Sequence, residues 1–467
     1  MANGNGYDLA IIGAGSAAFA AAIRAANLGV ETVMVERGTV GGTCVNVGCI
    51  PSKAELAGAA QRHRAAHNPF PGVTTSADGI DLAPLVAGKD ELVRSLRREK
   101  YVDLISHYGF EILEGTASFA DPETLLVDSE PLRAGRYLIA TGASPAVPPI
   151  AGLAEAGYLT STSALELREL PERLIVVGGN YVGLEFAQLF GRLGSQVTLV
   201  EALELVAPFE EPQASEVIAE VFAEEGIEVV TGALVERVER ACREKLVRAR
   251  VDGEELMFRA DEILIATGRR ANTELLALEN AGVATNGRGQ VEIDPTMRTT
   301  NPRVYAAGDV TPAPQFVYVA AKMGAAAAEN ALTDGERTID YSALPRITFT
   351  SPQIAAVGLT DEQANDLGMD CSCRTLPLEH VPRAIVERDT RGLVKLVVER
   401  ATRKLIGATV VAEGAADVIL AAVYAVQLGM TLDQITETWA PYLTMGEGFK
   451  LAAQIFDRDV AYLSCCA

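Results

Sequence analysis

Two stretches of the chain share one order of hydrophobic and polar positions. Each starts with a run of apolar residues and continues through a glycine-rich turn into a segment with apolar positions every three or four residues. Each then closes with a second apolar run that ends in a glutamate. The copies span residues 7–37 and 172–202. A buried strand, a tight turn, a helix and a second strand form a βαβ unit, so the pattern predicts two parallel sheets.

A second, shorter repeat supports a duplication. Residues 136–145 and 262–271 are each an apolar run that closes on Ala-Thr-Gly. Because chance rarely supplies two related pairs in the same order, we expect two domains built on one design.

The pattern of apolar and polar residues changes after about residue 340. Strand-like runs occupy residues 345–360, 392–400 and 404–412, and an amphipathic segment at 416–429 and a helix-like segment at 448–456 follow. This combination predicts an α+β third unit. The expected fold class is therefore α/β, with two Rossmann-like dinucleotide-binding domains and a C-terminal α+β domain.

The amino-acid composition disfavours some classes of function. The 467 residues are 49% apolar and 22% charged, and the net charge is −22. A chain this acidic is a poor partner for nucleic acids or anionic membranes, because their phosphates need a basic surface. We find neither a secretion signal before Tyr7 nor an apolar stretch of membrane-spanning length, so we expect a cytoplasmic protein.

The glycine turn of the first βαβ unit reads Gly-Ala-Gly-Ser-Ala-Ala, a G-x-G-x-x-A motif. Gly13 permits the tight turn, Gly15 lets the backbone approach a pyrophosphate, and Ala18 lets the helix pack closely on the strand. The helix N-terminus would face the phosphates, and Glu36 is placed to bind a ribose hydroxyl. Together these features predict a dinucleotide site.

The second glycine turn is a looser copy. Gly178 and Gly183 occupy the outer positions, but Asn180 stands where the middle glycine belongs. Glu201 lies where a ribose-binding acid would lie, which favours a 2′-hydroxyl over a 2′-phosphate, and the nearest arginine, Arg192, is on the helix. We therefore expect NAD(P)H at this site, with a preference for NADH that does not exclude NADPH.

The seven cysteines are odd in number and clustered, which favours working thiols over a disulfide scaffold. Cys44 and Cys49 directly follow the first βαβ unit, in the stretch GGTCVNVGCIPSK. Zinc binding is disfavoured because no second pair follows at zinc spacing. We expect the two thiols to be able to close a disulfide within about one helical turn, and a redox-active pair beside a flavin is the better interpretation.

Two dinucleotide motifs with Cys-x4-Cys-Ile-Pro-Ser-Lys after the first closely resemble the flavin-dependent pyridine nucleotide–disulfide oxidoreductases, the family of glutathione reductase. The resemblance covers essentially the whole chain, since residues 299–310 are similar to the second flavin-binding motif and residues 349–360 to the start of the dimerisation domain. It implies a glutathione-reductase-like fold. The implied domains are an FAD-binding domain at 1–148 and 269–338, an NAD(P)-binding domain at 149–268 and a dimerisation domain at 339–467.

The same resemblance implies roles for individual residues. Cys49 would be the thiol next to the flavin, and Cys44 would be the exchange thiol that faces the substrate. Lys53 and Glu185 would pair near the flavin N5, and Tyr181 would cover the nicotinamide pocket. The remaining implied cofactor-binding residues are Asp309, on the ribityl chain, and Gly42, Thr43, Thr141, Gly142 and Gly268.

One departure separates the chain from disulfide-reducing members, which carry His-Pro-Thr-x-x-Glu near the C-terminus. The last histidine in this chain is His380. Tyr442 stands where the family histidine should be, while Glu447 keeps the acidic position five residues later. A tyrosine with an ordinary pKa near 10 is a poor proton shuttle at neutral pH, so disulfide reduction is disfavoured.

Mercuric reductases, a group within this family, resemble the chain both in this stretch and in its last residues, LSCCA. Hg(II) is a soft ion that thiolates hold tightly. The resemblance implies that Hg(II) is reduced to Hg(0) by NAD(P)H through FAD, as in mercury detoxification. In a homodimer, Cys465 and Cys466 would pass Hg(II) to Cys44 and Cys49 of the other subunit, and Tyr442 is expected to assist the transfer.

Two alternatives stay open. One is a disulfide reductase of the thioredoxin reductase or dihydrolipoamide dehydrogenase type, and the other is a flavoprotein that sequesters Hg(II) without turnover. Many mercuric reductases carry an N-terminal metal-carrier domain, which we do not find before Tyr7, so we expect Cys465 and Cys466 or a separate partner to capture the ion. We interpret Cys371 and Cys373 as structural or incidental.

Overall fold

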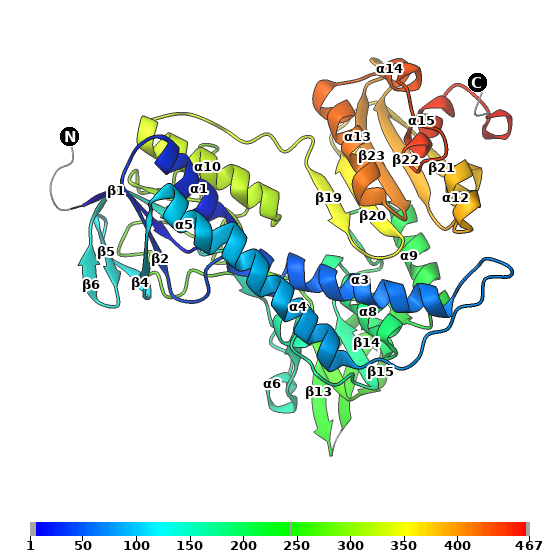
Figure 1. The fold of residues 1–467 in the computed structure, drawn as a ribbon, viewed down its shortest axis with the longest axis horizontal. Coiled ribbons are helices and arrows are strands. Elements are labelled where there is room, and N and C mark those ends of the chain that lie inside the picture. The colour runs from blue at the N-terminus through cyan, green and yellow to red at the C-terminus, as the bar shows by residue number, and fades with distance from the viewer. Residues whose placement is uncertain (1–5, 243, 464–467) are drawn as a thin grey trace.

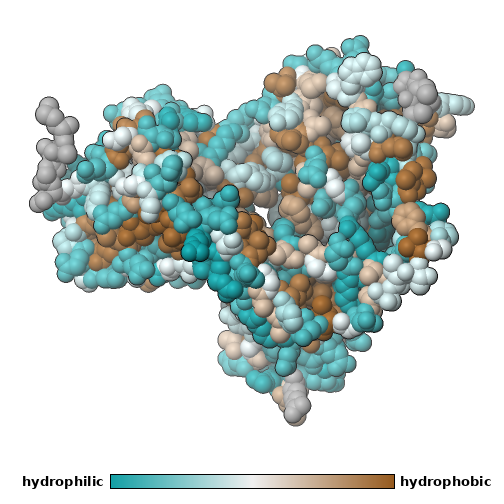
Figure 2. Space-filling view, viewed as in Figure 1, coloured by the Kyte–Doolittle hydropathy of each residue, from teal (hydrophilic) through white to brown (hydrophobic). Residues whose placement is uncertain are grey.

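The computed structural model describes residues 6–242 and 244–463. The chain forms three lobes, each built around its own five-stranded sheet (Figure 1). Figure 2 shows that the surface is hollowed where the left-hand lobe meets the other two, and that hydrophobic and hydrophilic patches alternate over this face. In the part of the chain that the structure describes, no helix has the length and apolar character needed to cross a membrane.

The first lobe contains a parallel sheet in the order β18-β7-β1-β2-β3. Its strands are β1 (Tyr7–Ile12), β2 (Thr32–Glu36), β3 (Glu111–Glu114), β7 (Ala134–Ile139) and β18 (Val304–Ala306). A small antiparallel sheet packs beside it, formed by β4 (Ala117–Asp121), β5 (Thr124–Val127) and β6 (Glu130–Leu132). β18 joins this sheet although the whole second lobe lies between β7 and β18 in the sequence.

Helices cover the first sheet because its strands are apolar on both faces, as parallel strands usually are. α1 and α10 pack side by side over one face (Figure 1). The helices of this lobe are α1 (Ser16–Asn27), α2 (Gly42–Val47), α3 (Cys49–Ala66), α4 (Leu82–Arg97), α5 (Asp103–Tyr108) and α10 (Val317–Thr333).

The second lobe repeats the design with a parallel sheet in the order β12-β11-β10-β16-β9. These strands are β9 (Leu159–Thr160), β10 (Arg173–Val177), β11 (Gln196–Val200), β12 (Glu228–Val230) and β16 (Glu262–Ile265). An antiparallel sheet of β13 (Ala233–Ala241), β14 (Glu244–Val251) and β15 (Glu254–Ala260) extends it. Its helices are α6 (Leu153–Ala156), α7 (Ser161–Ala164), α8 (Tyr181–Leu193) and α9 (Pro212–Glu224). A two-stranded link joins the two lobes, made of β8 (Ala143–Pro145) and β17 (Arg269–Ala271).

The third lobe is an antiparallel sheet with helices against it, in the strand order β19-β20-β23-β22-β21. The strands are β19 (Pro345–Thr348), β20 (Gln353–Gly358), β21 (Cys371–Pro377), β22 (Leu393–Glu399) and β23 (Leu405–Ala412). The helices are α11 (Asp361–Asp366), α12 (Pro382–Glu387), α13 (Ala415–Leu428), α14 (Leu432–Glu437) and α15 (Glu447–Gln454). The two predicted βαβ units and the predicted α+β unit are therefore confirmed.

Candidate active site

The first glycine turn has the geometry of a dinucleotide site. Gly13 has a φ of +112°, and a Cβ there would lie 2.5 Å from the carbonyl oxygen of Ala140, so protein packing alone requires glycine. At Gly15 a Cβ would meet nothing closer than Gly42 Cα at 3.6 Å, an ordinary van der Waals contact, so packing within the protein does not itself require glycine there. Gly15 is the N-cap of α1, and a residue without a side chain at a helix N-terminus fits close approach of the FAD pyrophosphate. Ala18 is fully buried under the turn.

Glu36 closes this turn from the end of β2. Its carboxylate accepts hydrogen bonds from the backbone N–H of Ala14 (2.8 Å) and from that of Gly38 (2.7 Å). The acid is therefore fixed beside the pyrophosphate position, where the ribose of a dinucleotide would lie.

The segment that carries the two cysteines docks directly on this turn. The Gly41 N–H donates to the Ala14 carbonyl oxygen (2.8 Å). Gly42 has a φ of +65°, and a Cβ on it would lie 2.6 Å from Gly15 Cα, so only glycine permits this approach. Two glycines in van der Waals contact thus bring Cys44 next to the first dinucleotide site.

The cysteines belong to two separate helices. Cys44 lies in α2, which ends at Val47, and Cys49 begins α3 after Gly48. The two cysteines therefore do not share one continuous helix, and the expected disulfide between them stays a prediction. Gly48 interrupts the helix, and a Cβ on it would lie 3.0 Å from the carbonyl oxygen of Thr43. Cys44 is half-buried, Cys49 is exposed, and both are free thiols.

The environment of the pair favours one thiolate. A hydrogen bond from the Cys44 thiol lowers the pKa of Cys49 to about 7, and the charge of Lys53 adds to this effect against partial burial. The same hydrogen bond, together with burial, raises the pKa of Cys44. As the pH rises through about 7, Cys49 is therefore the thiol that loses its proton, while Cys44 keeps its own.

Lys53 is tied to the second lobe. Its ammonium lies 2.7 Å from the carboxylate of Glu185, whose residue is only 4% exposed, and 4.8 Å from the centre of the Phe349 ring. The backbone N–H of Phe349 donates to the other Glu185 oxygen at 3.0 Å. The predicted Lys53–Glu185 pair is therefore formed. Phe349, which the sequence did not indicate, adds an anchor from the third lobe.

A second residue that the sequence did not indicate, Arg269, lies between predicted cofactor-binding residues. Its guanidinium contacts Thr43 Oγ1 at 3.4 Å, the carboxylate of Asp309 at 3.7 Å, and the Ala143 carbonyl oxygen. Its Nε is buried and has no hydrogen-bond partner among the described residues. Burial lowers the pKa of Arg269 and raises the pKa of Asp309. A buried guanidinium N–H without a hydrogen-bond partner in the described chain fits a polar cofactor at this position.

The two Ala-Thr-Gly sequences, which end at Gly142 and Gly268, lie where the chain enters the β8–β17 link between the first and second lobes. Thr141 Oγ1 donates to the Asn272 carbonyl oxygen (2.8 Å), and the carbonyl oxygen of Gly142 accepts the Asn272 N–H (3.0 Å). Gly268, with a φ of +124°, accepts the N–H of Ala146 at 2.9 Å. These glycines therefore turn the chain where it passes between the lobes.

The second glycine turn copies the first in its packing. Gly178 has a φ of +110°, and a Cβ added to it would lie 2.5 Å from the Ala266 carbonyl oxygen. This matches the first turn, where a Cβ added to Gly13 would lie 2.5 Å from the Ala140 carbonyl oxygen. A Cβ on Gly183 would overlap the carbonyl oxygen of Gly178, so helix α8 requires glycine there. The Asn180 Oδ1 is buried without a hydrogen-bond partner in the described part of the chain, which leaves an acceptor at the turn.

Glu201 lies at the second glycine turn as Glu36 lies at the first, with its carboxylate bound by two backbone N–H groups. Its carboxylate accepts the N–H of Gly179 and, at 2.8 Å, that of Leu203. Residues 201–211 contain four glutamates and neither lysine nor arginine. This loop therefore offers no cation to a 2′-phosphate.

Tyr181 lies at the first position of α8 and is half-buried. Its hydroxyl donates to the carboxylate of Glu210 at 3.1 Å, and its ring packs on Phe316 with centres 6.0 Å apart. Arg346 grips the same carboxylate through two hydrogen bonds of 3.0 Å. Burial and the negative charge of Glu210 raise the pKa of Tyr181, so its hydroxyl stays protonated. Tyr181 is thus held by two distant segments, and Arg346 from a third segment fixes the carboxylate that it binds.

The predicted C-terminal residues lie in the third lobe. Tyr442 is 57% exposed, and Glu447 is buried at the start of α15, which packs on β21, β22 and α14 of that lobe. One carboxylate oxygen of Glu447 has no hydrogen-bond partner among the residues described. Cys465 and Cys466 lie outside the described residues, so their assigned role stays a prediction.

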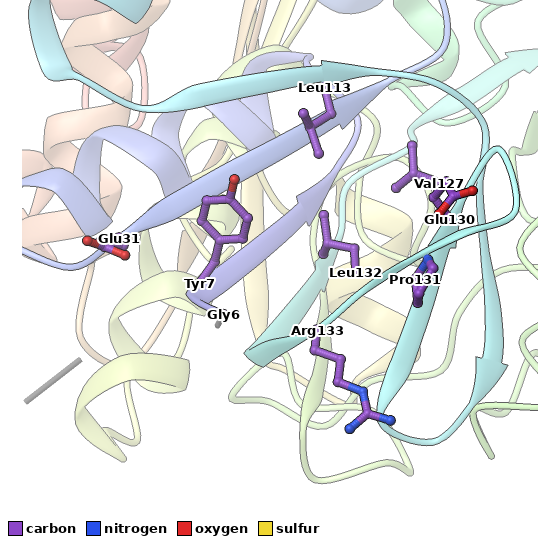
Figure 3. A pocket seen from close by; sticks show the side chains of 9 residues that line it. All are labelled: Gly6, Tyr7, Glu31, Leu113, Val127, Glu130, Pro131, Leu132 and Arg133. Carbon is purple, nitrogen blue, oxygen red and sulfur yellow. The ribbon is translucent and has the colours of Figure 1, made fainter. Parts of the chain in front are cut away.

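A separate hollow of about 470 Å³ is not part of this site. It lies between residues such as Tyr7, Glu31 and Arg133 (Figure 3). These residues stand at or before the starts of β1, β2 and β7, whereas ligands of parallel α/β sheets bind at the carboxyl ends of the strands. The hollow therefore lies at the opposite edge of the sheet from the glycine turn.

Comparisons with known proteins agree with this geometry. Residues 7–324 match the pyridine nucleotide-disulphide oxidoreductase family, and residues 344–453 match the dimerisation domain of that family. A mercuric reductase of Streptomyces lividans is 55% identical over 468 residues, which are 99% of this chain and 98% of that protein. A mercuric reductase of Staphylococcus aureus is 51% identical over 99% of this chain and 84% of its own.

Solved structures give the same fold. The flavoprotein disulfide reductase RclA of Escherichia coli, as a Cu(II) complex, superimposes with a TM-score of 0.86 at 31% identity, over 97% of this chain and 99% of its own. LpdA of Mycobacterium tuberculosis gives a TM-score of 0.85 at 29% identity, over 96% of this chain and 99% of its own.

These findings confirm the predicted α/β fold class, the family resemblance, and FAD and NAD(P)H as the cofactors. The dimerisation-domain match supports the expected homodimer. The chain belongs to the pyridine nucleotide–disulphide oxidoreductase family.

Proposed function

We propose that this protein is an enzyme that reduces Hg(II) to Hg(0) with electrons from NAD(P)H, using the Cys44–Cys49 pair. The observation that carries the proposal is a dithiol docked on the first dinucleotide turn in a chain with no histidine after His380. Proteins named mercuric reductase that cover nearly the whole chain support it. The reaction consumes one NAD(P)H and one Hg(II) and yields NAD(P)⁺, one proton and Hg(0).

Cys44 and Cys49 have different roles in binding Hg(II). Cys49 is the more acidic thiol of the pair and Cys44 the less acidic one. In our proposal Cys44, the exchange thiol that the family resemblance implies, takes the ligand place of a carrier thiol in an incoming Hg(II)–thiol complex. As Cys44 binds the metal, its proton goes to the departing thiolate. Two sulfurs then hold Hg(II) beside the flavin position, where FAD, when bound, supplies the electron pair that comes from NAD(P)H.

The residues around the pair keep this charge distribution. Lys53 stabilises the Cys49 thiolate and is itself held by Glu185. Arg269 and Asp309 line the same site and would hold the polar part of FAD. Tyr181 covers the nicotinamide pocket until the coenzyme displaces it, and the Glu210–Arg346 pair fixes its resting position.

The active site is shared between two subunits. α13 buries Ile419, Ala422 and Ala425, while Leu420, Tyr424 and Leu428 form an apolar stripe on its other face, 51–74% exposed. A second copy of the chain is the occupant of that stripe, since the lobe matches a dimerisation domain. Cys465 and Cys466 deliver Hg(II) to Cys44 and Cys49 of the partner chain, with Tyr442 and Glu447 beside the transfer path.

NADH is the preferred coenzyme. Glu201 is held by two backbone N–H groups at the ribose position, and the following loop is acidic without a basic residue. A 2′-phosphate would meet negative charge there and find no cation.

The test is oxidation of NADH by the FAD-loaded protein with Hg(II) in excess small thiol, and in parallel with oxidised glutathione, lipoamide or oxidised thioredoxin. The proposal predicts oxidation that requires Hg(II) and falls at least tenfold (~1.4 kcal/mol) in the Cys465→Ala/Cys466→Ala protein. Rapid turnover of a disulfide without a response to Hg(II) would instead support the disulfide reductase. Stoichiometric Hg(II) binding without NADH oxidation would support the sequestering protein.

Mixed dimers test the shared site. One chain carries Cys44→Ser and Cys49→Ser and the other carries Cys465→Ala and Cys466→Ala, with different affinity tags for purification. A shared site predicts roughly half of the wild-type activity, because one of the two sites is complete. Activity no higher than that of the two parent variants would show that each chain serves its own redox pair.

A further inference from the structure

Outside the proposed active site, the structure brings two more thiols together. Cys371 and Cys373 lie on β21, the edge strand of the third sheet (Figure 1). Residues two apart on a strand point to the same face, so both side chains face the same way. Both are half-buried free thiols.

One carboxylate connects the two sulfurs. The Cys371 thiol lies 3.5 Å from Asp361 Oδ1, and the Cys373 thiol lies 3.3 Å from Asp361 Oδ2, so each thiol donates to a different oxygen of one side chain. Sulfurs that share a carboxylate must lie near each other. The pair is thus oriented before any ligand arrives.

Asp361 is itself held in place. It begins α11 after Thr360, which caps the helix, and its backbone N–H donates to the buried carboxylate of Glu211 at 2.8 Å. Glu211 is in turn paired with the buried ammonium of Lys395 at 2.6 Å. This network joins the second and third lobes and fixes the carboxylate that orients the thiols.

The two thiols offer too few ligands for a structural zinc site but enough for Hg(II). Among the described residues, no group of three or more His, Cys, Asp and Glu side chains is arranged to hold a metal ion, which disfavours a closed four-ligand zinc site. Hg(II) needs only two thiolates in a nearly linear arrangement. Alternate residues of a strand are about 6.6 Å apart at Cα. Two metal–sulfur bonds of the zinc–sulfur length would span about 4.6 Å in a line, a separation that thiol side chains on such residues can reach by rotating about their Cα–Cβ bonds.

We propose that Cys371 and Cys373 form a second Hg(II)-binding site, separate from the redox pair. Hg(II) arrives as a bis-thiol complex, two new S–Hg bonds form, and two S–Hg bonds to the carrier break. The two protons of the cysteines pass to the departing thiolates, so nothing is oxidised or reduced. Because binding requires neither FAD nor NADH, the site holds the ion independently of the proposed reduction.

The test uses FAD-loaded protein in which Cys44, Cys49, Cys465 and Cys466 are replaced by serine, leaving Cys242, Cys371 and Cys373. The protein is reduced under anaerobic conditions and mixed with HgCl₂ in millimolar glutathione, and intact-mass spectrometry measures what stays bound. The expected product is one Hg per chain with the loss of two protons and no attached glutathione.

Adding Cys371→Ser and Cys373→Ser should lower Hg retention roughly 100-fold or more, since one thiol cannot chelate. Cys242→Ser is the matched control and should leave retention unchanged. FAD content and dimer mass check folding in each protein. Retention that survives loss of Cys371 and Cys373, or none in the starting protein, would overturn the proposal.

Discussion

At the scale of single residues, the account depends on how two thiols share one proton. The hydrogen bond from Cys44 stabilises the Cys49 thiolate, and Lys53 adds a positive charge. The resulting pKa of about 7 is well below the value near 8.5 of a free thiol. The Cys49 thiolate is thus about half formed near pH 7, becomes dominant above it, and is lost as the pH falls through this value.

The reactivity of Cys49 should follow this pKa. In the reduced protein, the alkylation rate of the Cys49 peptide, followed by mass spectrometry, should rise with pH to a plateau with a midpoint near 7. Cys44→Ala removes the hydrogen-bond donor, so the midpoint should move up towards 8.5. Cys373→Ala is the control and should leave the midpoint near 7. A midpoint that does not respond to Cys44→Ala would contradict the proposed sharing of the proton.

Coenzyme choice is also a property of single residues. Glu201→Gln removes the negative charge while keeping an acceptor for the two backbone N–H groups. The ratio of kcat/KM for NADH to that for NADPH should favour NADH in the wild type and fall by roughly tenfold in the variant. Glu228→Gln, on neighbouring β12, is the control. A wild-type preference for NADPH would show that another residue binds the 2′-phosphate.

The sequence predicted site residues whose role follows from the neighbouring residues in the chain. It did not predict site residues whose role depends on contacts between segments far apart in the sequence. Gly13 and Gly178 could be identified because a tight turn between strand and helix requires glycine. Arg269, Phe349 and Arg346 could not, because they meet Thr43, Glu185 and Glu210 only after segments more than a hundred residues apart have packed together. The sequence also did not show that Gly48 separates Cys44 and Cys49 into two helices.

At the scale of elements, the decisive contact joins the first glycine turn to the start of α2. Gly15 and Gly42 approach so closely that a single added methyl group on Gly42 would overlap the backbone. The turn that fits a pyrophosphate therefore also positions the redox pair. Binding of the cofactor and placement of the thiols should be coupled.

Gly42→Ala tests this coupling. The positive φ costs an alanine about 1–2 kcal/mol, and the overlap with Gly15 adds to this, so we expect a lower melting temperature and loss of most bound FAD on gel filtration. Gly29→Ala is a matched control, because Gly29 has a φ of +73° but open space around it. That variant should lose stability without losing FAD. Equal FAD content in the two variants would contradict the coupling.

At the scale of the whole molecule, our proposal of a site shared between two chains depends on the third lobe. Tyr442 is exposed, Trp439 is 96% exposed, and one oxygen of Glu447 is buried without a partner in the described part of the chain. These residues and the α13 stripe belong to the lobe that matches a dimerisation domain. The sequence predicted the dimer from family resemblance. The exposed stripe itself became visible only when burial separated the two faces of α13.

Charges on the stripe should separate the subunits. Tyr424→Glu with Leu428→Glu places carboxylates in the proposed interface, so the dimer dissociation constant should rise roughly 30-fold or more, as for a binding hot spot. Sedimentation velocity measures this change, and Hg(II)-dependent turnover should fall with the dimer fraction. Leu234→Glu, an equally exposed position on β13, is the control. An intact dimer after both substitutions would place the interface elsewhere.

The central claim is that electrons from NAD(P)H reach Hg(II) at Cys44 and Cys49. The most direct measurement follows NADH oxidation and traps the volatile metal from the same anaerobic reaction, for the wild type and for Cys44→Ala/Cys49→Ala. The account predicts one Hg(0) per NADH oxidised and no Hg(0) above background from the variant. NADH oxidation without Hg(0), or equal Hg(0) from the variant, would contradict it.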